Sequence, residues 1–324
     1  MITIRPFEET ESDFEALVTI QNAEWPDEPT TLENIKFWEE NRNKNYLRQR
    51  FLIEKEIDGQ TQVIAECGTW ESAWSYVPGK YGIGFGIQPE YACQGIEAIM
   101  YDHVMDFLNQ REPQPKVLNS FMREDRTERV NFFTDRGFEI IMRENESDLI
   151  VTDYDFSRFD GAFDKVAANG IEIVTLPELK ERFPDWIQRY YDLYIPIDTD
   201  VPSPDDLTPQ PLEEFAKGFN SPGHLADAHF IALDGDKWVG LSTLNKDNAN
   251  PKRLWVSITG VLRGHRRKGI ATALKLKTIQ YAIDYGAEKI QTGNEENNPM
   301  YDLNVMLGFK PMPAWLELRK MVEG

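Results

Sequence analysis

Apolar positions recur with a period of two in some segments and of three to four in others, which indicates strands alternating with helices. A long helix is expected at 269–287, where Ile270, Leu274, Thr278 and Tyr281 fall on one face and Gly286 ends the pattern. In the second half, strands are expected at 171–176, 229–235, 237–244, 253–261, 289–294 and 314–321, and further helices at 178–194 and 299–309. In the first half, the runs 49–57 and 61–70 predict a similar hairpin.

The same order of parts occurs twice along the chain. Residues 81–108 and 254–283 each contain a β-rich run, a turn, a glycine and a helical pattern. Gly95 is followed after 42 residues by the Gly-Phe pair at Gly137, and Gly269 after 39 residues by the pair at Gly308. Two landmarks at nearly constant offset predict a duplicated domain.

The join between the two copies is expected where strand patterning stops, in the stretch 151–163. Aromatic residues in this stretch favour a tethered linker over a flexible one. We therefore expect one domain at 1–155 and a second at 156–324, a division that the length of 324 residues also favours.

The net charge of −20 at pH 7 argues against general nucleic-acid binding, which depends on neutralising phosphates. No apolar run reaches the roughly 18 to 20 residues of a membrane span, and the N-terminus lacks a signal-peptide pattern. With two cysteines, Cys67 and Cys93, a disulfide framework is not expected, and the cytoplasm is the expected compartment. We expect no metal, since no His/Cys/Asp cluster has the spacing of metal ligands. We also expect no nucleic-acid or membrane partner, and a monomer or homodimer.

Cationic side chains gather at the junction of the predicted strand 253–261 and the helix after it. A helix start offers unpaired N–H groups and a positive dipole end to an anion. Gly269 lets the backbone approach a phosphate closely, and Ala271 keeps the first turn free of bulk. Arg266 and its neighbours Arg267, Lys268, Ile270 and Thr272 complete a cradle suited to a pyrophosphate, most readily that of an acyl-coenzyme A.

The loop resembles the acetyl-coenzyme A signature of the Gcn5-related N-acetyltransferase (GNAT) family, with Arg266, Gly269 and Ala271 at the signature positions. The run 292–309 resembles the second cofactor region of that family. Because the resemblance covers both halves, the chain looks like a tandem GNAT protein, similar in layout to the mycothiol synthases.

The resemblance implies an α/β fold (α+β, with a mixed sheet): two tandem domains, each a twisted mixed sheet with splayed central strands flanked by helices. It implies that the edge formed by Ile258, Thr259, Gly260 and Val261 pairs with the pantetheine arm, and that Asn297 and Asn304 belong to the second cofactor region. The resemblance further implies that an amine attacks the thioester directly, and that backbone N–H near Val261 holds the developing oxyanion.

The first copy of the loop departs from the signature. Alanine at position 92 stands where the arginine is expected, and Glu97 stands where Gly or Ala is expected. A carboxylate next to a phosphate costs binding energy. We therefore interpret the first domain as a degenerate GNAT-like domain that is structural or substrate-shaping, while leaving open that it binds an uncharged ligand.

The residue that moves the proton is less clearly marked. Asn304 stands where many GNAT enzymes place a tyrosine that acts as the acid for the leaving thiolate. Tyr301, a candidate for that role, lies three residues earlier on the same predicted helix. Glu295 or Glu296 could act as the general base. His229 is a weaker candidate, and His265 is more readily assigned to the phosphate loop.

The resemblance implies an acyltransferase that moves the acetyl group of acetyl-CoA to an amine, and we expect the primary amine of a small molecule as the acceptor. The acidic segment 197–207, with Asp198, Asp200, Asp205 and Asp206, is where a cationic amine could be attracted. A peptide or protein amine is an alternative acceptor. An inactive acyl-CoA sensor or scaffold is an alternative from another class, favoured by the missing tyrosine.

Overall fold

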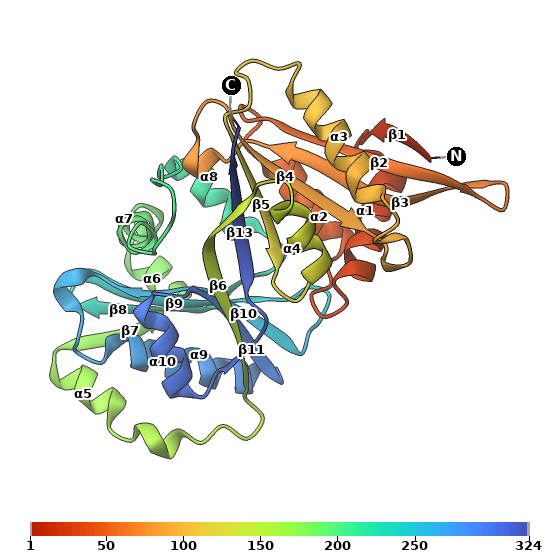
Figure 1. The fold of residues 1–324 in the computed structure, drawn as a ribbon. Helices are drawn as coiled ribbons and strands as arrows, with labels where there is room; N and C mark the ends of the chain where they lie inside the picture. The colour runs from red at the N-terminus through yellow and green to blue at the C-terminus, as the bar shows by residue number, and fades with distance from the viewer. Residues whose placement is uncertain (1, 323–324) are drawn as a thin grey trace. The chain divides into compact units, whose positions relative to one another are not determined.

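The computed structural model describes residues 2–322, and they divide into two compact units. The first unit comprises 1–143, 204–208 and 314–324, and the second comprises 144–203 and 209–313. Their order along the chain is visible in the colours of Figure 1. Each unit therefore contains short segments from the other half of the chain, which a single division near residue 155 does not describe.

The first unit is built on a mixed sheet in the order β1-β2-β3-β4-β5-β13. Phe51 and Ile53 of β2 pack on one face with α3 and α4, and the intervening Leu52 packs on the other face with α1 and α2. The strands are β1 (Ile2–Pro6), β2 (Arg48–Ile57), β3 (Gln60–Trp70), β4 (Lys80–Ile87), β5 (Val117–Arg123) and β13 (Trp315–Met321). The helices are α1 (Glu11–Glu24), α2 (Leu32–Asn41), α3 (Ile96–Leu108) and α4 (Thr127–Thr134), with short 3-10 turns η1 (Ala73–Ser75) and η2 (Pro89–Tyr91).

The second unit has a sheet in the order β6-β11-β10-β9-β8-β7. Ile231 and Leu233 of β8 pack against α6 and α7, whereas Phe230 and Ala232 pack against α5 and α9 on the opposite face. The strands are β6 (Glu139–Ile150), β7 (Ile171–Thr175), β8 (His224–Asp234), β9 (Lys237–Lys246), β10 (Arg253–Val261), β11 (Lys289–Glu295) and the short β12 (Lys310–Pro311). The helices are α5 (Ala162–Ala168), α6 (Leu176–Arg182), α7 (Trp186–Asp198), α8 (Leu212–Lys217), α9 (Ile270–Tyr285) and α10 (Pro299–Leu307), with 3-10 turns η3 (Phe156–Phe159), η4 (Gly218–Asn220) and η5 (Arg263–His265).

The last strand of each half lies in the sheet of the other unit. β13, at the end of the chain, pairs antiparallel with β5 of the first unit. The part of β6 from Glu144 onward pairs antiparallel with β11 of the second unit, over Glu144–Ile150. The two sheets are therefore completed by an exchange of strands, a feature that no local sequence pattern encodes.

The central strands of both sheets separate as predicted. β4 and β5 pair in parallel only at Lys80–Gly82, and β10 and β11 only at Arg253–Trp255. Beyond these three-residue contacts, one edge of β4 and one edge of β10 have no strand partner within the sheet order of their own units. The expected fold class, two tandem mixed sheets with splayed central strands, is confirmed.

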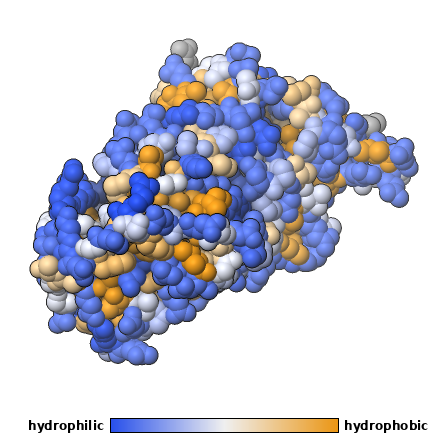
Figure 2. All heavy atoms as spheres, turned by 90° about the horizontal axis from the view of Figure 1, so that it is seen from below, coloured by the Kyte–Doolittle hydropathy of each residue, from blue (hydrophilic) through white to orange (hydrophobic). Residues whose placement is uncertain are grey.

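Two predicted elements differ from the observed ones. The helix expected at 178–194 is two helices, because Pro184 lies between α6 and α7 and cannot supply a helical N–H. The predicted linker 151–163 contains the 3-10 turn η3 and the first residues of α5, whose Val166 packs against α9. No helix within residues 2–322 is long and apolar enough to cross a membrane. Hydrophilic residues cover most of the face in Figure 2, with hydrophobic residues in separate patches.

Candidate active site

The loop between β10 and α9 contains two residues with a left-handed backbone, Arg267 at φ 65° and Gly269 at φ 84°. Gly269 is the N-cap of α9, and within the described part of the chain no side chain caps this helix. The first amides of the 16-residue helix α9 therefore have no capping acceptor. Such amides, together with the helix dipole, form a site for an anion.

The cations at this loop come from the loop itself and from helix α5. Arg266 donates from Nε to the carbonyl of Val261 at 2.9 Å and from Nη2 to Asp200 at 2.6 Å. Arg267 is exposed on the turn and Lys268 is half-buried. Lys165 of α5 lies beside the loop, since its Cδ is 3.5 Å from the position that a Cβ of Gly269 would take. Sequence analysis missed Lys165, because no local pattern predicts the helix α5 that carries it.

The open edge of β10 places the backbone of Val261 toward the splay. Leu262 donates its N–H to Val239 of β9, and Val261 lies opposite Gly240 in the same pairing. In an antiparallel pair the intervening residue turns its N–H and C=O away from the partner strand. The Val261 N–H is thus available at the edge where the resemblance requires a donor.

β10 also carries a β-bulge between Val256 and Ile258, which leaves Ser257 without a partner in β9. The equivalent pairing of β3 with β4 shows no register shift. A bulge re-aims the backbone of its strand and is common next to active sites. Sequence analysis missed Ser257, since a bulge depends on the register of two strands.

The side chains of the other predicted edge residues have structural partners. Ile258 and Ile270 are in the core, so their backbones alone are available to a ligand. Thr259 shares a hydrogen bond with Ser242 at 2.7 Å. A Cβ at Gly260 would collide with Ile197 of α7, so this glycine permits close packing of α7 on β10. Ala271 and Thr272 are half-buried in the first turn of α9.

The predicted site residues on the β11 side of the gap between β10 and β11 do not form a single cluster. Asn297 donates from both its backbone N–H and its Nδ2 to the carboxylate of Glu295, at 2.8 Å each. Asn304 is fully buried and donates to Asn294 Oδ1 at 2.6 Å. Tyr301 is half-buried in the first turn of α10, and Glu296 is exposed. Since Asn304 is an amide, no phenol occupies that position.

A carboxylate that sequence analysis missed lies next to β11. The side chain of Glu144, from the exchanged strand β6, lies so close to Gly293 that a Cβ on the glycine would collide with it. Burial raises the pKa of Glu144 above its usual value. Only the pairing of β6 with β11 brings Glu144 to this site.

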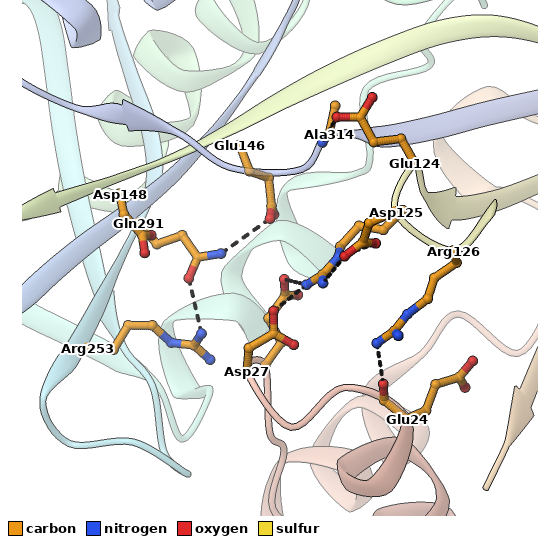
Figure 3. A network of polar contacts seen from close by, with 12 residues as sticks. Glu24, Asp27, Glu124, Asp125, Arg126, Glu146, Asp148, Arg253, Gln291 and Ala314 are labelled. Atoms are coloured by element: carbon orange, nitrogen blue, oxygen red, sulfur yellow. Dashed lines mark hydrogen bonds and ion pairs between the residues drawn. The ribbon is translucent and has the colours of Figure 1, made fainter. Parts of the chain in front are cut away.

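Polar side chains continue from Glu144 along the same face of the sheet. Arg253 donates to Gln291 Oε1 at 3.1 Å, and Gln291 donates to Glu146 at 3.3 Å (Figure 3). Gln291, Gly293 and Glu295 alternate with Ile290, whose side chain packs with α9. The polar face of β11 is therefore the one opposite α9.

Lys275 of α9 is another group that sequence analysis missed. Its side chain is 1% exposed, and among the described residues its Nζ has no hydrogen-bond partner. The ammonium lies 5.1 Å from the ring centre of Phe309. Burial lowers the pKa of Lys275 to about 7.

The acidic segment after α7 is already largely neutralised. Asp200 pairs with both Arg263 and Arg266, at 2.5 Å and 2.6 Å. Asp205, within the first unit, pairs with Lys80 at 2.9 Å and Arg319 at 2.8 Å. The expectation that these two attract an amine is not supported by their pairing. Asp198 differs, since it accepts a hydrogen bond from Tyr194 and burial raises its pKa.

The two candidate histidines, His229 and His265, have partners within the protein. His229 is 7% exposed and shares a hydrogen bond with Tyr190 at 2.9 Å within the aromatic core against α7. Burial lowers the pKa of His229 to about 3, so the ring is neutral. His265 lies 3.1 Å from Asp234. Tyr190 of α7 is part of this core, and Trp186 and Tyr194 pack against it.

The first-half loop has the same backbone as the second, with Cys93 at φ 60° and Gly95 at φ 85°, each 174 residues before its counterpart. The two loops differ in one side chain of the helix that follows, which is Glu97 in the first half and Ala271 in the second. Glu97 Oε1 accepts a hydrogen bond from the Cys93 N–H at 2.8 Å. An anion would have to displace this carboxylate, whereas Ala271 leaves the second loop open.

Residues 186–309 match the model of the acetyltransferase (GNAT) family. A tandem GNAT protein from the clavulanic acid biosynthesis pathway has a similar structure, with a TM-score of 0.75 at 14% identity over 100% of this chain and 99% of that one. A GCN5-related N-acetyltransferase from Sphaerobacter thermophilus gives 0.68 at 13% over 100% and 96%. A GCN5-related glucosamine N-acetyltransferase region of a fungal multi-domain GH3 beta-N-acetylglucosaminidase gives 0.69 at 13% over 99% and 38%. A comparison with curated protein sequences gives no match.

The chain therefore carries a GNAT-family acetyltransferase domain at 186–309. Over its whole length, its fold is that of a tandem GNAT protein. The recognition made from the loop residues is confirmed, and the roles of the individual site residues remain predictions.

Proposed function

We propose that this protein is an N-acetyltransferase that uses acetyl-CoA to acetylate the primary amine of a small molecule, with the cofactor site in the second unit. The observation that carries the proposal is the contrast between two loops of equal backbone shape. One loop holds its own carboxylate, that of Glu97, on a loop amide, whereas the other has uncapped amides and nearby cations.

The residues of the second loop fit the diphosphate of coenzyme A. Gly269 has space in place of a side chain at a left-handed position, and the α9 amides, Lys268 and Lys165 supply donors. Bound acetyl-CoA supplies the activated acetyl group. Arg266 would exchange its bond to Asp200 for one to phosphate while keeping its bond to the Val261 carbonyl.

Two groups of the chain are placed for the transfer step. The Val261 N–H on the open edge of β10 would stabilise negative charge that develops on an acyl oxygen, a type of contact worth roughly 3 to 4 kcal/mol. Glu144 or Glu295 would accept a proton from the acceptor ammonium. The raised pKa of Glu144 makes its carboxylate the better matched base near neutral pH.

Our proposal of a small amine as the acceptor rests on the face of the sheet opposite α9. Asp198 offers a half-buried carboxylate at the end of α7, hydrogen-bonded by Tyr194, to which a cationic group would be attracted. Tyr301, half-buried in the first turn of α10, would act as the acid for the leaving thiolate. In this proposal the protein works without a metal, and its partner is the small amine rather than a nucleic acid or a membrane.

Calorimetry of the full chain with CoA, followed by acetyl transfer assays with small amines and peptides, tests the proposal. We expect CoA binding and turnover with at least one small amine. Binding without turnover on any amine would instead indicate a sensor or scaffold, and turnover confined to peptides would move the acceptor class. If CoA and acetyl-CoA produce no heat, the proposed cofactor site is wrong.

A further inference from the structure

The first unit contains a pocket of about 330 Å³ on the face of its sheet that α1 and α2 cover. Its lining includes Glu24 of α1 and Trp25 directly after that helix, Arg48 and Arg50 of β2, and Glu66 and Trp70 of β3. This volume is within the range of small-molecule sites. The loop held by Glu97 precedes α3, on the other face of the sheet, so the pocket is separate from that loop.

The floor of the pocket follows from strand register. Arg50 of β2 lies opposite Gly68 of β3, and Gly68 lies opposite Gly84 of β4. Two glycines side by side leave a trough across these strands, because neither has a Cβ. Trp70 borders the trough on one side, since a Cβ on Gly84 would lie 3.0 Å from its indole.

Glu66 borders the trough on the other side, opposite Gly86 of β4. A Cβ on Gly86 would lie 2.9 Å from Glu66 Cγ, so this glycine gives the glutamate room to lie over the strand. The run Gly82-Ile83-Gly84-Phe85-Gly86 thus places three glycines on one face of β4, beneath Trp70 and Glu66.

One end of the pocket has more positive than negative charge. The guanidinium groups of Arg42, Arg48 and Arg50 share the carboxylate of Glu39, at 2.6 Å, 3.4 Å and 3.4 Å. Arg50 also lies 3.9 Å from Glu66, too far for a hydrogen bond. Among residues 2–322, the buried Arg50 Nη1 has no hydrogen-bond partner. A carboxylate at this end would complete the pairing of Arg48 and Arg50.

The other end has two carboxylates close together. Glu24 is 7% exposed and pairs with Arg129. Burial, with a smaller effect from the Glu66 carboxylate, raises the pKa of Glu24. Glu66 accepts a hydrogen bond from Gln21 at 3.3 Å. The backbone of Glu24 is fixed as well, since Arg126 donates to its carbonyl oxygen at 2.7 Å (Figure 3).

We propose that this pocket binds a small zwitterion of amino-acid size, with its carboxylate at Arg48 and Arg50 and its ammonium at Glu66 and Glu24. The nonpolar part of the ligand lies along the trough against the Trp70 indole. A polyanion is disfavoured by the two glutamates, and a simple amine by the two arginines, so the pocket selects a molecule that carries both charges. The first unit would then be a ligand-binding domain and not only a structural one.

Calorimetry with the full chain and each free L-amino acid in turn tests the site. We expect at least one to bind. Its amide, which lacks the carboxylate, and its N-acetyl derivative, which lacks the ammonium, should each bind at least about tenfold more weakly. If no amino acid produces heat, or if both derivatives bind as well as the parent, the proposal is overturned.

Two charge-removing variants test the assignment of the two ends. Arg50→Met should weaken amino-acid binding about tenfold or more, and so should Glu66→Gln. Matched changes at exposed positions of the same unit, Arg111→Met and Glu128→Gln, should leave it unchanged. If the first pair binds as wild type does, the ligand is elsewhere.

Thermal unfolding and CoA titration of each variant show whether the chain is intact. If Arg50→Met does not fold, Arg48→Met tests the same end of the pocket, since its side chain is more exposed. CoA affinity should be the same in all of these variants, so this test is separate from the proposed cofactor site. An amino acid that binds a chain with no affinity for CoA would support the pocket alone.

Discussion

The carboxylate of Glu97 accepts a hydrogen bond from the backbone N–H of Cys93, 2.8 Å away, inside the first-half loop. The counterpart of Glu97 in the second half is Ala271, which has no polar side chain to offer. The two loops share left-handed residues at equivalent positions. One side chain therefore distinguishes a loop that holds its own anion from one that is open to an external anion.

Placing a carboxylate in the second loop should reproduce the state of the first. Ala271→Glu is expected to weaken CoA binding at least tenfold, because the new carboxylate would compete for the loop amide and repel phosphate. Calorimetry with CoA measures the change. Ala271→Ser, which adds a small neutral group, is the control and should bind within about threefold of wild type. Equal affinity of Ala271→Glu and wild type would contradict the assignment of the loop.

Charge changes around the two glycines should have unequal effects. Gly269→Glu and Arg266→Glu are each expected to lower CoA affinity at least tenfold, because both put negative charge at the phosphate loop. Gly95→Glu places the same residue at the same left-handed position of the first loop and should leave CoA affinity near wild type. Similar losses from both glycines would mean that the second unit is not the single cofactor site.

Glu144 is expected to act as general base. Glu144→Gln should lower kcat by about a hundredfold or more, whereas Glu295→Gln, whose wild-type carboxylate is bonded to Asn297, should have a smaller effect. A carboxylate base works when deprotonated, so wild-type kcat/KM should fall as the pH drops through the raised pKa of Glu144. That limb should disappear in Glu144→Gln. A pH profile that keeps the limb would exclude this role.

Lys275 should destabilise the fold most where its buried amine is charged. The pKa is about 7 in the folded chain against 10.5 ordinarily, so between these values the unfolded chain binds a proton that the folded chain lacks. The free energy of unfolding from this group therefore rises with pH from about 7 to 10.5. Lys275→Met should stabilise the protein, on the order of 4 kcal/mol at pH 7 and below, with a smaller gain as the pH rises. Denaturant unfolding across this range measures it, and a gain independent of pH would contradict the assignment.

Gly260 and Ile197 should be energetically coupled. Gly260→Ala is expected to cost about 1 to 3 kcal/mol of unfolding free energy, because its methyl group would collide with Ile197. Ile197→Ala alone should also destabilise the protein, since Ile197 is buried. The double variant should lose less unfolding free energy than the sum of the losses of the two single variants, as a double-mutant cycle would show. Additive losses would place the cost of Gly260→Ala elsewhere.

Local patterns identified most of the elements and the glycine turn between β10 and α9. The helix expected at 269–287 is α9, and the strand expected at 253–261 is β10, because periodicity and a glycine at each helix end are local signals. The helix expected at 178–194 was wrong in one respect, since Pro184 divides it. The departure of the first loop from the second at Glu97 is also a local feature of the sequence, although the hydrogen bond from the Cys93 N–H to Glu97 is not.

The duplicated plan, the glycine turn before α9 and the charge difference between the two loops can be predicted from the amino-acid sequence, because they depend on residues close together in the chain. Three other relationships become visible only in the folded chain: β6 and β13 exchange sheets, Glu144 lies over Gly293, and Arg50, Gly68 and Gly84 form one trough. Those relationships depend on the register of strands distant in sequence, and register is set by the packing of the whole sheet.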